Sequence, residues 1–138
     1  MTYYANCVIL NVFTMKVQDI DRTLADKVFA ICDYYLQGKT KRYSRHIYDI
    51  HKLLSKVPLG EEFKVLVKQV RAERAEMDIC PSAASGVNVP ELLMEIIDKE
   101  IYKEDYVSIT TYFQREPISY DEAVKSVEII AKSGMFEE

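Results

Sequence analysis

Residues 21–37 read DRTLADKVFAICDYYLQ, a pattern typical of an amphipathic helix. Its apolar side chains recur three and four positions apart and share one arc of a helical wheel: Leu24, Val28, Ile31, Cys32 and Tyr35. Thr23 and Asp26 have the spacing of a capping box, so we expect the helix to begin there. Gly38 can adopt a left-handed backbone conformation and end the helix. This stretch predicts a helical fold.

The rest of the chain extends this helical pattern. Residues 44–54 read SRHIYDIHKLL, in which Ser44 can cap a helix over 45–54 that ends before Pro58. Further helices are expected over 60–77, 90–98 and 104–113, and from a capping box at Ser119 and Glu122 to near Gly134. We therefore predict a mainly α fold, a bundle of about five or six helices forming one domain over residues 1–138.

The stretch before this bundle predicts a short N-terminal β element. Residues 7–17 are apolar and rich in β-branched side chains. One or two strands are not stable as a sheet on their own. The element is therefore expected to pack on the helices, to pair with another chain, or to form the edge of a domain that this chain lacks.

Composition and length exclude several protein classes. The chain has 138 residues, of which 49% are apolar and 29% charged, which is ordinary for one globular domain and argues against disorder. No segment has the length and apolarity of a membrane span or a signal peptide, so we expect a cytoplasmic protein without a membrane partner. Three scattered cysteines and two histidines predict neither a disulfide framework nor a metal site on this chain.

Charge is distributed unevenly along the chain. Residues 39–56 hold six basic residues against one acidic residue, whereas residues 90–138 hold twelve acidic against five basic residues. A basic strip on an acidic chain suggests a site for phosphate or for an acidic partner. The alternative is a solvated loop and helix start that happen to be basic.

Two linked motifs resemble a known family. The first is Arg22-Thr23-Leu24-Ala25-Asp26-Lys27, and the second is Ser44-Arg45-His46-Ile47-Tyr48-Asp49. Together they resemble the C-terminal helical half of the AbiEii/AbiGii toxin nucleotidyltransferase family, whose members carry an RT-x-x-(E/D)-K helix start followed by an (S/A)RH-x-YD helix. The segment Glu104-Asp105-Tyr106 is similar to a DY helix near the family's end, and the resemblance covers roughly residues 12–138.

The chain also departs from this family. Family enzymes have an N-terminal core in which a Gly-Ser motif and paired acids hold the metal and the nucleotide. Here none of the four glycines precedes serine, and no strand-borne Asp-x-Asp is found. We therefore expect that the catalytic core is absent and that the chain is inactive alone, as a fragment, a split-gene product or a degenerate remnant. Mg²⁺ and NTP are implied only for a complete family member.

The resemblance also implies roles for individual residues. Lys27 and Asp49 are the expected catalytic pair, in which Lys27 contacts phosphate and Asp49 supports the active site. Arg45, Arg42 and His46 are expected to bind the nucleotide. Each has a structural alternative: Lys27 can be a lysine at the edge of a packed face, Arg45 and Asp49 a surface ion pair, and His46 a buried histidine that braces its helix.

These observations lead to two functional hypotheses. The first is the C-terminal nucleotide-closing domain of an AbiEii-like toxin of a toxin–antitoxin or phage-defence (abortive infection) system. Its partner would be an antitoxin or the missing catalytic half, and tRNA or another RNA is implied only by the resemblance. The alternative is a non-catalytic interaction module that binds an antitoxin or forms a homo-oligomer through the N-terminal strand. Convergence of Lys27, Arg45 and Asp49 on one open, concave surface would favour the first hypothesis. A Lys27 side chain that points away from Asp49, or a surface filled by packed side chains, would favour the second.

Overall fold

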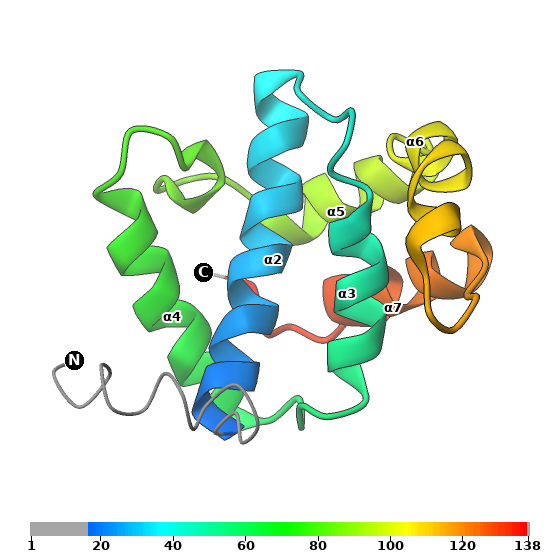
Figure 1. Ribbon diagram of the computed structural model, residues 1–138. Helices are drawn as coiled ribbons and strands as arrows, with labels where there is room; N and C mark the ends of the chain where they lie inside the picture. Colours follow the sequence, from blue (N-terminus) through cyan, green and yellow to red (C-terminus); the bar gives the residue numbers. More distant parts are fainter. Residues whose placement is uncertain (1–16, 138) are drawn as a thin grey trace, which may run out of the picture.

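The structure, a computed structural model, describes residues 17–137, and these residues form helices and no β-strand (Figure 1). The helices are α2 (Val17–Gln37), α3 (Arg45–Leu54), α4 (Glu61–Ala75), η1 (Pro81–Ala83), α5 (Val89–Asp98), α6 (Lys103–Ser108), η2 (Thr110–Phe113) and α7 (Tyr120–Lys132). The mainly α prediction is therefore confirmed. The predicted β element over residues 7–17 lies outside the described residues, except for Val17, which is the first residue of α2.

Helix α2 is the central element of the bundle. It lies between α3 and α4, and α5 and α7 lie behind α2 and α3 (Figure 1). Its predicted apolar arc is buried, since Leu24, Ile31 and Cys32 are fully inaccessible to solvent. Burial of such an apolar surface is the main force that holds a bundle of this size together. No helix in the described part of the chain is both long and apolar enough to span a bilayer.

Both ends of α2 test the sequence predictions. The helix begins at Val17, so the prediction that Thr23 caps its start is wrong. Ile20 packs against the core, which favours continuing the helix before Thr23. The predicted end is confirmed: Gly38 has a φ of +70°, and its N–H donates to the carbonyl of Tyr35. The N–H of Lys39 donates to the carbonyl of Tyr34, which completes a Schellman motif.

The other helix boundaries follow the predictions closely, with two differences. Helix α3 has the predicted bounds, but the side chain of Ser44 does not cap it. The helix expected over 104–113 is interrupted at Ile109, whose non-helical backbone separates α6 from η2. At the start of α7, Ser119 Oγ accepts a hydrogen bond from the N–H of Glu122, as the capping box predicts. The fold therefore follows the predicted helical pattern apart from these two differences.

Candidate functional site

Packing of α3 against α2 brings together Lys27 and Asp49. Lys27 Nζ donates a hydrogen bond to Asp49 Oδ2 over 3.0 Å. The side chains of Lys27 and Asp49 are 23% and 22% exposed, so the pair lies at the surface but is partly shielded from water. Lys27 therefore points toward Asp49, as the nucleotide hypothesis requires.

His46 lies beside this pair as a neutral acceptor. Its Nδ1 is 3.4 Å from Lys27 Nζ. Burial, together with the positive charge of Lys27, lowers the pKa of His46 from 6.5 to about 4, against the opposing effect of Asp49. At neutral pH the imidazole is therefore uncharged, and Nδ1 can accept a hydrogen bond from the ammonium while Nε2 carries the proton.

Two tyrosine rings support His46 on the same surface. The rings of Tyr34 and Tyr43 stack with centroids 3.7 Å apart and an angle of 5° between their planes. The His46 ring lies nearly parallel to both, at centroid distances of 5.9 Å from Tyr34 and 6.3 Å from Tyr43. His46 therefore has the bracing contacts expected of a structural histidine, and at the same time it orients Lys27.

Arg45 adds a second positive charge to the pair. Its Nε lies 3.7 Å from Asp49 Oδ1, and its side chain is 60% exposed. Two cations thus share one carboxylate. A lysine ammonium has three donors, of which Asp49 and His46 take two among the described residues. The remaining donor of Lys27 and the guanidinium of Arg45 are available to an anion such as a phosphate or a carboxylate.

Arg42 is not brought into this cluster. It is exposed in the loop between α2 and α3 and has a φ of +75°. Its backbone N–H donates to Asp105 Oδ1 over 2.8 Å. Within residues 17–137, no contact joins its guanidinium to Lys27, Arg45 or Asp49. The same described residues contain no group of three His, Cys, Asp or Glu side chains that could hold a metal ion.

The structure also reveals a contact of Asp105 that the sequence did not predict. Asp105 Oδ2 accepts hydrogen bonds from the N–H and the hydroxyl of Ser44, over 3.2 and 2.5 Å. The Ser44 hydroxyl lies 2.6 Å from Thr110 Oγ1 in the interior. Asp105 belongs to the DY segment noted in the sequence, but its partner is 61 residues away. No local sequence signal could have identified that pairing.

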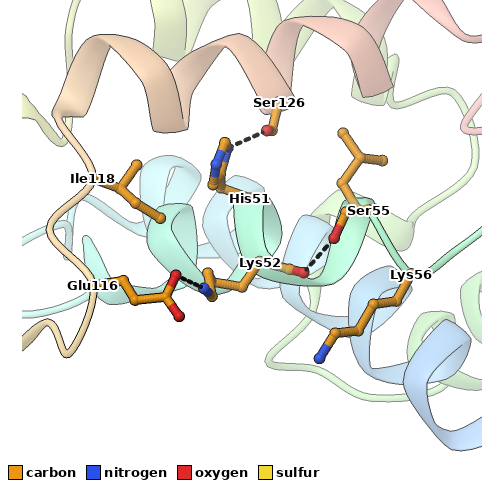
Figure 2. A pocket seen from close by; sticks show the side chains of 8 residues that line it. His51, Lys52, Ser55, Lys56, Glu116, Ile118 and Ser126 are labelled. Atoms are coloured by element: carbon orange, nitrogen blue, oxygen red, sulfur yellow. Dashed lines mark hydrogen bonds and ion pairs between the residues drawn. The ribbon is translucent and has the colours of Figure 1, made fainter.

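A separate hollow of about 720 Å³ lies between α3, α7 and the segment that precedes α7 (Figure 2). It is lined by His51, Lys52, Leu54, Ser55, Lys56, Glu116, Ile118 and Ser126. Lys52 is paired with Glu116 over 2.8 Å, and His51 Nδ1 lies 2.7 Å from Ser126 Oγ. None of the residues that the sequence predicts as site residues lines this hollow. Its volume is therefore no reason to place the candidate site there.

Comparison with known proteins identifies the family. The family model described as "Nucleotidyl transferase AbiEii toxin, Type IV TA system" matches residues 2–126. No curated protein and no solved structure matches the chain. The match extends over most of the chain and includes both motifs and the helices that bring Lys27 to Asp49. The protein therefore belongs to the AbiEii nucleotidyltransferase toxin family.

Proposed function

We propose that this chain is the helical, nucleotide-closing part of an AbiEii-type toxin and that the surface formed by Lys27, Arg45 and Asp49 binds nucleotide phosphates. The observation that supports this best is the imbalance of charge, because two cations share a single carboxylate beside a neutral histidine. Such a surface has donors left for an anion.

Nucleotidyl transfer defines what these residues would do. A nucleophile attacks the α-phosphate, the bond between the α- and β-phosphates breaks, and pyrophosphate leaves. Positive groups that are already in place stabilise the negative charge that develops on the phosphate oxygens during this step. In the proposed mechanism Lys27 and Arg45 contact the triphosphate. Asp49 fixes the position of Lys27.

A complete enzyme of this kind also needs a divalent metal, which would stabilise the negative charge of the phosphates when bound. The candidate surface offers one carboxylate, whereas such metal sites use several oxygen ligands. We propose that the metal ligands come from a Gly-Ser motif and paired acids on a separate catalytic core, and that this chain alone binds nucleotide without turning it over. The family description names a type IV toxin–antitoxin system, which supports an antitoxin as the functional counterpart.

Isothermal titration calorimetry with each NTP and Mg²⁺ tests this proposal. We expect measurable binding by the purified chain and about a ten-fold loss of affinity in Lys27→Met and in Arg45→Gln, the size expected when a charged hydrogen bond is lost. Lys132→Met is the matched control, since Lys132 is also a surface lysine paired with an acid, Glu128, over 3.1 Å.

Two results would contradict the proposal. If the wild-type chain binds no NTP, the surface is not a nucleotide site and the interaction-module hypothesis is favoured. If Lys132→Met weakens binding as much as Lys27→Met does, the nucleotide responds to overall charge and not to this surface.

A further inference from the structure

The carboxylate of Asp105 holds the loop that leads into the candidate site. Asp105 Oδ1 accepts from the N–H of Arg42, and Oδ2 accepts from both the N–H and the hydroxyl of Ser44. A single side chain from α6 therefore fixes two backbone donors and one hydroxyl in the connection between α2 and α3. Hydrogen bonds to a charged acceptor are stronger than those to a neutral one.

The loop conformation needs such support. Arg42 has a φ of +75°, a left-handed conformation that residues with a side chain seldom adopt. Strained backbone of this kind persists where its surroundings hold it in place. The Ser44 side chain, which could have capped α3, is turned to Asp105 and Thr110, and Ser44 is completely buried.

The loop is also the immediate neighbour of the candidate site. Ser44 directly precedes Arg45, and Arg45, His46 and Asp49 all lie in the first two turns of α3. Fixing Ser44 therefore fixes where α3 begins and how it is rotated about its axis. That rotation decides whether Asp49 and His46 face Lys27.

We infer that Asp105 is a positioning residue: it holds the loop between α2 and α3 so that Arg45, His46 and Asp49 face Lys27. The consequence for nucleotide binding rests on the proposed function, whereas the consequence for the geometry of the cluster does not. Asp105 itself makes no described contact with Lys27 or Asp49, so its effect passes through Arg42 and Ser44.

The chain offers a matched control in Asp33. Asp33 Oδ1 accepts from the N–H and the hydroxyl of Ser82, over 2.8 and 2.5 Å, which repeats the way Asp105 holds Ser44. This second anchor holds the loop around η1, which packs mainly against α2 and α4. Asp33→Asn therefore removes the same kind of acceptor, together with the charge paired with Arg74, from a loop that does not lead into the site.

The test compares Asp105→Asn with Asp33→Asn by NMR and calorimetry. His46 and His51 are the only histidines of the chain. His51 is held by Ser126, so the imidazole signals of His51 serve as an internal reference. Asp105 accepts hydrogen bonds at both carboxylate oxygens, whereas asparagine has one acceptor oxygen. The NH₂ group that replaces the other oxygen would face an N–H donor. We expect Asp105→Asn to shift the His46 imidazole signals, leave those of His51 in place, and weaken NTP·Mg²⁺ binding about ten-fold.

Asp33→Asn is expected to lower the midpoint of thermal unfolding, while the His46 imidazole signals and the affinity for NTP·Mg²⁺ stay unchanged. If Asp105→Asn fails to fold, Ser44→Ala removes one of the same hydrogen bonds and should shift His46 in the same direction by less. Unmoved His46 signals, or moved signals with unchanged affinity in a chain that binds NTP, would overturn the inference. If the wild-type chain binds no NTP but His46 moves, the proposed function fails and the positioning of the cluster stands.

Discussion

Helix α2 takes part in two ion-pair clusters, and they differ in how fully their charges are paired. Toward α4, Arg22 binds Glu73, and Arg74 binds both Asp26 and Asp33, so that two arginines meet three carboxylates. Toward α3, Lys27 and Arg45 share Asp49 alone. A cluster whose cations are all paired holds helices together, whereas a cluster with excess cation can still attract a ligand.

Burial separates the two clusters further. Asp33 is 3% exposed, and besides Arg74 it holds the backbone of Ser82. Lys27 and Asp49 keep about a fifth of their side-chain surface in water, and Arg45 keeps more than half. The cluster facing α4 therefore contributes to stability, and the one facing α3 contributes less but remains open to solvent.

Substitution in the buried cluster facing α4 is expected to change the stability of the fold most. Asp33→Ala removes the more buried of the two carboxylates that Arg74 binds, together with the acceptor of Ser82, and we expect it to destabilise the fold by about 3 kcal/mol, since a largely buried charge loses much of its pairing. Urea unfolding followed by circular dichroism measures this. A loss below about 1 kcal/mol would mean that the cluster facing α4 is no more structural than an exposed pair.

Protonation of His46, in the cluster facing α3, is expected to have an intermediate effect on stability. The folded state keeps His46 neutral down to about pH 4, whereas the unfolded chain takes up a proton near pH 6.5. The stability that His46 contributes is thus complete above pH 6.5 and is lost as the pH falls toward 4. Allowing for the partial exposure of His46, we expect a loss of about 1–2 kcal/mol over this range.

The comparison with His46→Gln isolates this contribution, because carboxylates elsewhere titrate in the same range. Glutamine keeps an acceptor for Lys27 but does not ionise. Unfolding free energies measured from pH 7 to pH 4 should fall less steeply in His46→Gln than in wild type. Parallel curves would show that His46 is not held in the neutral state by its contacts with α2.

The two clusters also differ in how far the sequence could predict them. Lys27 and Asp49 were found because they belong to two linked motifs, and the apolar arc of α2 predicted which face of that helix is buried. Arg74 and Asp33 were not found, because 41 residues separate them and no motif joins them. The start of α2 and the turn of Ser44 toward Asp105 were missed for the same reason: each depends on contacts between distant segments.

Asp49→Asn is expected to change stability least, and it tests directly whether the clusters facing α3 and α4 differ in function. The pair it breaks is partly solvated, so we expect a cost below about 1 kcal/mol. The substitution also leaves Lys27 and Arg45 without their shared negative charge, so the affinity for inorganic triphosphate should rise a few-fold, and this gain should diminish as salt screens it. Calorimetry at two salt concentrations measures both effects. A large loss of stability with no gain in anion affinity would place Asp49 with the structural carboxylates facing α4, and the difference between the two sides of α2 would then not separate structure from function.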